Sequence, residues 1–385
     1  IVFGDWSSDV CSSDLRNLLP VSIRFIGTGT DKNIVLNAQK KVMTIAPFSS
    51  LILYDIPLEH SNYFFKTHNA EHDFVCRESF LPAPKNFGSL QSVRKNYAYT
   101  FSSKKPGDQI VRFEGNIVVR KPIFIPCGIQ VEIKPGTSFD FLNRSFLLTE
   151  SPIYAMGNET NTIGFGSSDN TGQGIVIMNC HQRSRFVYCH FKNLHSPVFQ
   201  AWSVPGIVNL VNTKAIVEYS EFLNGSTNTA LFLTGSEMEF NRSQVNLQNG
   251  KAIQAFFSNL KVSYSIFNQS DMEAFHLLSS VAQLDTCSIF ECNTGVLADF
   301  NSRVNLNQSM INSATSAIVS DNGSFIHSFH STVKECQLAI SVKNTFQVFS
   351  PGQFVSNHMK MSNNQSNFFV GNGATLNYNG NIVNP

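Results

Sequence analysis

The feature that most constrains this chain is a repeat of about 22 residues that runs from residue 184 to residue 370. Each copy has a small residue two positions before an apolar one, as in FVYCHFKN, VEYSEFLN and VSYSIFNQ. A regular spacing held over eight copies indicates one structural unit per copy, stacked as a solenoid. The predicted apolar column contains Phe191, Phe222, Val245, Phe267, Phe290, Ile311, Val333 and Met361.

A second column has the same period and is expected to stack in the same way. About 22 residues are too few for a strand, a covering helix and a second strand, but they suffice for two or three short strands and their turns. Apolar and polar residues alternate within each segment, which is typical of strands with one buried face. We therefore predict an all-β fold, a right-handed parallel β-helix. The second column contains Val198, Ala230, Ala252, Ala274, Val296, Ala317 and Ala339.

The β-helix is expected to span residues 107–385, with regular rungs over 184–370. Within the irregular first coils, the Gly/Ser/Asn-rich interval Gly157–Gly174 breaks the period and is predicted to be a side loop. Residues 16–106 lack the period and are expected to form a small N-terminal β-rich domain or cap. A cap is physically useful because a bare solenoid end exposes apolar side chains and unpaired strand edges.

The first residues call for a separate interpretation. The stretch Asp5 to Leu15 (DWSSDVCSSDL) is what a common sequencing adapter encodes. We interpret residues 1–15 as an adapter artefact and expect the natural N-terminus to be missing, so that a signal peptide cannot be observed.

Charge and cysteine usage narrow the function classes. The formal net charge is +1 and charged residues make up 14% of the chain, so no basic surface for nucleic acid is expected. No apolar run is long enough for a transmembrane helix. Without Cys11, seven cysteines remain and none forms a CxxC pair, so we expect small buried hydrophobes rather than a zinc site or a disulfide framework. They are Cys76, Cys127, Cys180, Cys189, Cys287, Cys292 and Cys336.

Several segments carry a family resemblance. The stretches IPCGIQVEIKPGTSFDF, SPIYAMG, IGFGSSDNTGQGIVIMN and SRFVYCHFKNL resemble bacterial pectate-lyase-like β-helix proteins of the cell envelope. More narrowly, AWSVPGIV is similar to a Trp-containing turn in the β-helix proteins associated with CotH-type domains. The resemblance implies an extracellular or envelope location in a bacterium. It also implies Asp-Ala pairs on successive rungs, and none of the residues that precede the alanine column is Asp.

Catalytic chemistry on such a fold needs charged groups on one face. Asp299 and Asp321 lie 22 positions apart, at nearly equivalent places on adjacent rungs, and are the candidate carboxylate pair. Glu273 and His276 flank Ala274 and are predicted to project to different sides. No metal site is predicted and no cofactor is expected, with Ca²⁺ entering only if the protein is a lyase. For each of these four residues, the alternative is a structural role, either in the interior or exposed to solvent.

A ligand-binding surface is the other candidate. Trp202 and Tyr219, with Phe199 and Phe257, are predicted to form an aromatic platform for sugar rings, although interior packing is the alternative for the two phenylalanines. The leading hypothesis is a non-catalytic extracellular or envelope protein that binds polysaccharide or another surface component. The alternatives are a polysaccharide lyase or glycoside hydrolase, and a structural spacer or adhesin stalk. The oligomeric state is left open.

Overall fold

The computed structural model describes strands between residues 2 and 103, without their side chains, and residues 109–384 except 200, 201, 248, 347 and 348. At 109, 202 and 226–228 it describes the backbone alone. Contacts between Cα atoms divide the chain into two compact units, one mainly Ile1–Lys85 and the other the remainder. Within the described residues, no helix is long and apolar enough to cross a membrane.

The first unit contains two antiparallel sheets. The three-stranded sheet has the order β1-β2-β6, and in the five-stranded sheet β3 pairs with β4, β5 and β7. The boundary of a cap at residue 106 and the artefact interpretation of residues 1–15 stay predictions. The strands are β1 (Val2–Gly4), β2 (Ser12–Arg16), β3 (Ile23–Thr30), β4 (Asn33–Leu36), β5 (Met43–Ile45), β6 (Ser50–Tyr54), β7 (Asn62–Thr67) and β8 (Phe74–Arg77).

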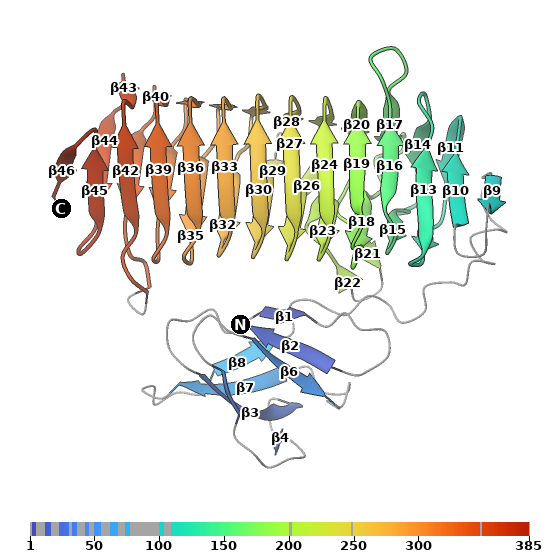
Figure 1. Cartoon of the computed structure of the whole chain (residues 1–385), viewed down its shortest axis with the longest axis horizontal. Helices are drawn as coiled ribbons and strands as arrows, with labels where there is room; N and C mark the ends of the chain where they lie inside the picture. Colours follow the sequence, from blue (N-terminus) through green and yellow to red (C-terminus); the bar gives the residue numbers. More distant parts are fainter. Residues whose placement is uncertain are drawn as a thin grey trace. The chain divides into compact units, whose positions relative to one another are not determined.

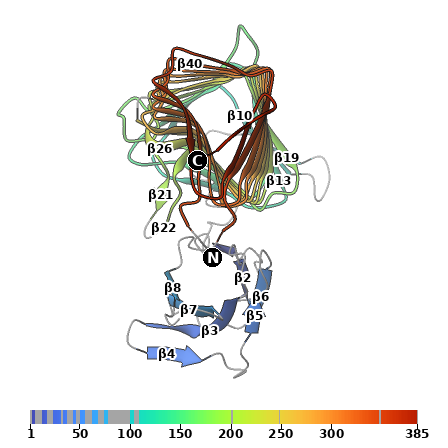
Figure 2. The same cartoon turned by 90° about the vertical axis from the view of Figure 1, so that its left-hand side faces the viewer.

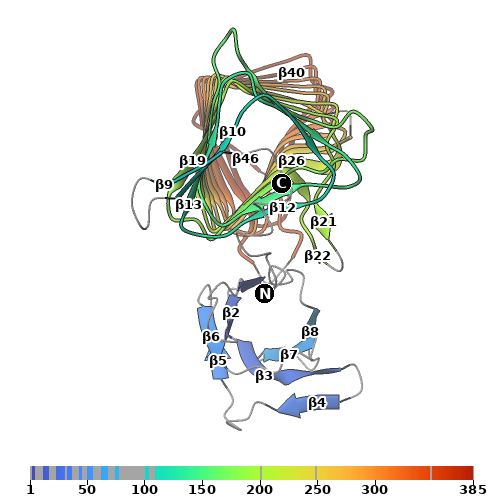
Figure 3. The same ribbon diagram turned by 90° about the vertical axis from the view of Figure 1, so that its right-hand side faces the viewer.

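The second unit is a coil whose rungs lie side by side in Figure 1, and three long sheets enclose its interior in the views along the coil (Figures 2 and 3). We name these sheets faces 1, 2 and 3, in the order in which each rung passes through them. Their strands pair in parallel, and only β9 and β46, at the ends of face 1, pair antiparallel. The predicted all-β fold, a parallel β-helix with rungs of about 22 residues, is confirmed.

Face 1 has 14 strands. They are β9 (Thr100–Ser103), β10 (Gln109–Phe113), β13 (Ile129–Ile133), β16 (Ile153–Met156), β19 (Arg183–Val187), β24 (Lys214–Glu218), β27 (Glu237–Asn241), β30 (Asn259–Ser263), β33 (Val281–Asp285), β36 (Arg303–Asn307), β39 (Phe325–Phe329), β42 (Gln353–Asn357), β45 (Thr375–Tyr378) and β46 (Asn381–Val383).

Face 2 has 11 strands. They are β11 (Asn116–Val119), β14 (Ser138–Phe141), β17 (Ile163–Gly166), β20 (Cys189–Lys192), β25 (Glu221–Leu223), β28 (Gln244–Asn246), β31 (Ile266–Asn268), β34 (Ser288–Phe290), β37 (Met310–Asn312), β40 (Thr332–Lys334) and β43 (Lys360–Ser362).

Face 3 also has 11 strands, and a separate two-stranded sheet, β21 (Val198–Phe199) and β22 (Trp202–Ser203), precedes its fourth strand in the chain. The strands of face 3 are β12 (Ile123–Ile125), β15 (Leu147–Thr149), β18 (Ile175–Met178), β23 (Gly206–Val211), β26 (Ser226–Thr234), β29 (Asn249–Phe256), β32 (Glu273–Leu278), β35 (Thr294–Asp299), β38 (Ser316–Ser320), β41 (Leu338–Val342) and β44 (Ser366–Val370).

The interior is built from stacked identical side chains. Phe165, Phe191 and Phe222 occupy the same place in three successive rungs, with ring centroids 4.9 and 4.5 Å apart. These distances match the spacing of about 4.8 Å between neighbouring strands. The rings therefore stack because the backbone hydrogen bonds set their separation, and most of the predicted apolar column lies in the core of the β-helix.

One rung departs from the predicted columns. Phe267 pairs with Ile289, which is fully buried. Phe290, the predicted member of the column, follows Ile289 in the chain and is half-buried. The turn from β34 to β35 is shorter than the turn one rung earlier, so Val296 pairs with Phe275 and belongs with the large residues of face 3.

Two further segments differ from the prediction. Val198 lies in the side hairpin β21–β22, outside the coil. The interval Gly157–Gly174 is not one continuous loop, because it contains β17, which pairs with β14 and β20 on face 2. The turns on either side of β17 account for the broken period.

The small residues of the repeat supply hydrogen bonds at the corner between faces 1 and 2. The Ser243 hydroxyl accepts from the backbone N–H of Ser220 at 3.0 Å and donates to the carbonyl of Asn241 at 2.8 Å. A hydroxyl thus satisfies buried backbone groups where the turn interrupts the strand pairing. Of the predicted cysteines, Cys127 is exposed and Cys76 lies outside the residues described with side chains, and the other five are buried.

Candidate functional site

All three corners of the coil turn at residues with left-handed backbone conformations, and the corner between faces 1 and 2 is the one with large side chains stacked along it. Each of eight rungs turns there at a non-glycine residue with a φ between 45 and 55°. Bulky side chains rarely adopt this left-handed conformation, but it recurs at the other two corners and is a property of the turn. We call these residues the corner column. It contains Tyr188, Tyr219, Arg242, Tyr264, Thr286, Gln308, His330 and His358.

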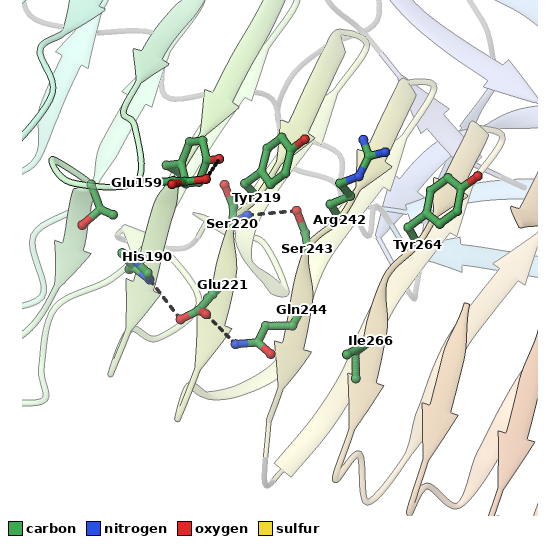
Figure 4. A pocket seen from close by; sticks show the side chains of 12 residues that line it. Glu159, His190, Tyr219, Ser220, Glu221, Arg242, Ser243, Gln244, Tyr264 and Ile266 are labelled. Carbon is green, nitrogen blue, oxygen red and sulfur yellow. Dashed lines mark hydrogen bonds and ion pairs between the residues drawn. The ribbon is translucent and has the colours of Figure 1, made fainter. Parts of the chain in front are cut away.

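The first four members of the corner column stack along the helix axis. The rings of Tyr188 and Tyr219 are parallel, with centroids 4.8 Å apart and an interplanar angle of 8°. Arg242 continues the stack, with its Cζ 5.8 Å from the Tyr219 centroid and 5.2 Å from that of Tyr264. The ring faces are therefore turned toward stacking partners, and the phenol hydroxyls and the guanidinium are the groups left to meet a ligand (Figure 4).

These side chains line a groove with a volume of about 490 Å³, which we call the corner groove. On its face 2 side, the Glu221 carboxylate accepts a hydrogen bond from the Gln244 amide at 2.6 Å and pairs with the His190 ring at 3.1 Å (Figure 4). At its N-terminal end, the Tyr188 hydroxyl donates to the Glu159 carboxylate at 3.2 Å. Desolvation, then this hydrogen bond, raises the pKa of the Tyr188 phenol.

The structure places Tyr219, Phe199 and Phe257 apart from one another. Tyr219 lies in the groove with 39% of its surface exposed. Phe199 packs edge-on against Phe124 of face 3 at 5.5 Å, and Phe257 lies at the corner between faces 3 and 1. The Trp202 side chain lies outside the described residues. Tyr219 thus has Tyr188 and Arg242 as its stacking neighbours instead of Phe199 and Phe257.

The three other members of the stack carry a signal in the sequence. Each directly precedes the small residue of its repeat, as Tyr219 does in VEYSEF. The period that aligns the buried residues also aligns this exposed position. The same column therefore predicts which side chains share the corner.

Asp299 and Asp321 lie at the ends of adjacent strands of face 3, since Ala298 pairs with Ser320 directly before them. Asp299 accepts hydrogen bonds from Phe300 N–H at 2.8 Å and from the Asn322 amide at 2.7 Å, and burial is the main cause that raises its pKa. Its catalytic assignment stays a prediction.

Asp321 is 4% exposed and holds its surroundings together. Its carboxylate accepts hydrogen bonds from the backbone N–H groups of Asn322 and Thr345, both at 2.8 Å, and pairs with Lys343 at 3.4 Å. Lys343 and Thr345 belong to the long connection between β41 and β42, so these contacts hold the start of that connection in place. They are the contacts of a structural carboxylate, and a catalytic role for Asp321 also stays a prediction.

A second polar cluster lies on the outside of face 3. Lys251 Nζ is 2.6 Å from His276 Nδ1 and 3.3 Å from the Glu273 carboxylate. The prediction that Glu273 and His276 project to different sides is wrong, because Ala274 and Phe275 are both buried and this irregularity returns His276 to the outer face. Burial, followed by the charge of Lys251, lowers the pKa of His276 to about 4.

Metal ligands do not gather in the described part of the chain. Among those residues, no group of three or more His, Cys, Asp or Glu side chains is placed to hold a metal ion.

Comparison with known proteins gives similarity at the level of structure. No known family profile and no curated protein matches the sequence. The periplasmic alginate epimerase AlgG aligns with a TM-score of 0.34 and 8% identity, over 76% of this chain and 100% of that chain. The catalytic domain of a GH87 α-1,3-glucanase in complex with nigerose gives 0.35 and 8%, over 98% of this chain and 91% of that one.

The Streptococcus pneumoniae surface protein and adhesin PfbA gives a TM-score of 0.35 and 9% identity, over 70% of this chain and 90% of that chain. By their names, these three similar structures are a periplasmic epimerase, a glucanase and a surface adhesin. At such identities and TM-scores, the similarity carries no argument about what this chain binds or does.

Proposed function

We propose that the protein is a non-catalytic bacterial β-helix protein, located outside the cell or in its envelope, that binds polysaccharide or another hydroxyl-rich surface component in the corner groove. The narrower relationship to β-helix proteins associated with CotH-type domains is part of the same proposal. The observation that carries it is the row of outward hydroxyl and guanidinium groups on successive rungs.

The spacing of the rungs supports a polymer as the ligand. Neighbouring strands lie about 4.8 Å apart, so groups of the corner column recur at that interval along the groove. A chain of sugar units running parallel to the helix axis presents hydroxyls in a comparable regular row. The Tyr219 and Tyr264 hydroxyls can donate to and accept from such a ligand, and the Tyr188 hydroxyl, which donates to Glu159, can accept.

The test is retention of the full chain on immobilised neutral and anionic polysaccharides, with and without Ca²⁺. Tyr219→Phe keeps the ring stack and removes one hydroxyl, so we expect a several-fold weaker affinity, in line with the loss of about 1 kcal/mol for one hydrogen bond. Tyr154→Phe, on face 1 outside the groove, is the matched control and leaves affinity unchanged. Equal affinities for wild type and Tyr219→Phe on every polymer would count against the groove.

A second candidate function is a polysaccharide lyase or glycoside hydrolase, and the Lys251–Glu273–His276 cluster favours it because such groups perform acid–base chemistry. The same polymers are assayed for release of reducing or unsaturated ends. Asp299→Asn and Lys251→Met are then compared separately. Loss of product in one variant identifies that residue as part of the reaction centre, and product from the wild type overturns the non-catalytic proposal.

A further inference from the structure

We propose that the corner groove selects a saccharide with an anionic substituent, a carboxylate or a sulfate, and that Arg242 is the residue that binds it. This inference rests on the proposed function and narrows its ligand class. Carboxylate and sulfate share the chemistry that a guanidinium recognises, namely negatively charged oxygens that accept paired N–H donors.

Arg242 is held in place without being neutralised. The rings of Tyr219 and Tyr264 lie on either side of the guanidinium along the stack. Within the described residues, the Arg242 side chain makes no ion pair and no hydrogen bond. Cation–π contacts use the flat faces of a guanidinium, so its N–H edges stay available for an anion.

The acidic residues of the groove already have partners of their own. Glu221 is engaged by His190 and Gln244, and Glu159 accepts from Tyr188. Outside the groove lining, two arginines of the face 1 strand β19, Arg183 and Arg185, are paired with glutamates at 3.1 and 3.2 Å. Arg242 is thus the cation of the groove whose charge is not countered.

The position of Glu159 makes the two ends of the groove differ in charge. It contacts Tyr188, which is two rungs before Arg242 in the corner column, or about 10 Å along the axis at the usual strand spacing. An anionic group is repelled at the Glu159 end and attracted at the Arg242 end. The groove therefore places the anionic unit of a polymer beside Arg242 and its neutral hydroxyls beside Tyr188 and Tyr219.

The corner conformation tolerates the substitution needed for a test. Gln308 occupies the equivalent place in a later rung with a φ of 48°, so Arg242→Gln is compatible with the turn. Arg242→Lys keeps the charge and loses the planar guanidinium. Arg303→Gln removes an exposed arginine from face 1, away from the groove, and serves as the control.

The experiment measures the affinity of the full chain for polygalacturonate against its methyl ester, and for dextran sulfate against dextran. We expect tighter binding of one or both anionic polymers, weakened by salt. Arg242→Gln should lower the affinity for the anionic polymer at least tenfold and leave the affinity for the neutral polymer unchanged. The affinity of Arg242→Lys for the anionic polymer should lie between those of the wild type and Arg242→Gln. The two polymer pairs distinguish carboxylate from sulfate.

The contrary outcomes are distinct. Binding without a preference for charge, or equal losses for charged and neutral polymers in Arg242→Gln, overturns this inference and leaves the proposed function standing. Failure of the wild-type protein to bind any polymer overturns both. A preference for charge that Arg303→Gln abolishes as fully as Arg242→Gln also refutes the assignment to Arg242.

Discussion

Burial changes the chemistry of individual side chains on this coil, and His276 is the clearest case. Its pKa is lowered to about 4, mainly by burial and then by the neighbouring Lys251 charge. In an unfolded chain the pKa returns to about 6.5. Between these values the unfolded chain binds more protons than the folded one, so the stability present above pH 6.5 is lost as the pH falls toward 4.

We therefore expect the free energy of unfolding in urea to fall between pH 7 and pH 4.5, and to fall by about 2 kcal/mol less in His276→Gln, which cannot titrate. His181→Gln, at an exposed histidine, is the control and keeps the wild-type decrease. A His276→Gln variant that shows the full decrease would assign the acid sensitivity to other groups.

At the scale of the strand, the rung with the shortened turn offers a direct test of register. Ile289 is fully buried in the apolar column, and Phe290 is half-buried outside it. Ile289→Ala should lower the free energy of unfolding by about 2–5 kcal/mol, the usual cost of a cavity in a packed core. Phe290→Ala should cost clearly less, although it removes the larger side chain. Chemical denaturation measures both, and a larger loss for Phe290→Ala would restore the register that the sequence spacing suggested.

At the scale of the whole molecule, the energy of a solenoid is set mainly by contacts between neighbouring rungs. Val281 pairs with Arg303, so deletion of residues 281–302 removes one complete rung and joins matching positions. We expect this protein to keep its β-type circular dichroism spectrum and to melt cooperatively at a somewhat lower temperature.

Deletion of residues 281–291 is the matched control, because half a rung joins different faces. It should lose the cooperative melt. If both deletions melt alike, the coil is not stabilised by rung-to-rung register in the way that the pairing implies.

The sequence alone determined the all-β class, the period of about 22 residues and most of the buried columns, because side chains that stack between equivalent rungs must repeat at the length of a rung. It also singled out Tyr219, which lines the groove and whose binding role stays a prediction. It did not place Ile289, which lies beside the larger Phe290. It did not place Val296 either, because the short turn before β35 shifts the register of face 3 by one residue.

Only the tertiary structure decided the groove and the polar cluster. The partners of Tyr219 come from rungs before and after it, and their stacking depends on turns that direct exposed side chains along the axis. Likewise, Glu273 and His276 share a face only because two consecutive residues of β32 are buried. Such contacts depend on the turns and irregularities of individual rungs, which a periodic pattern averages away.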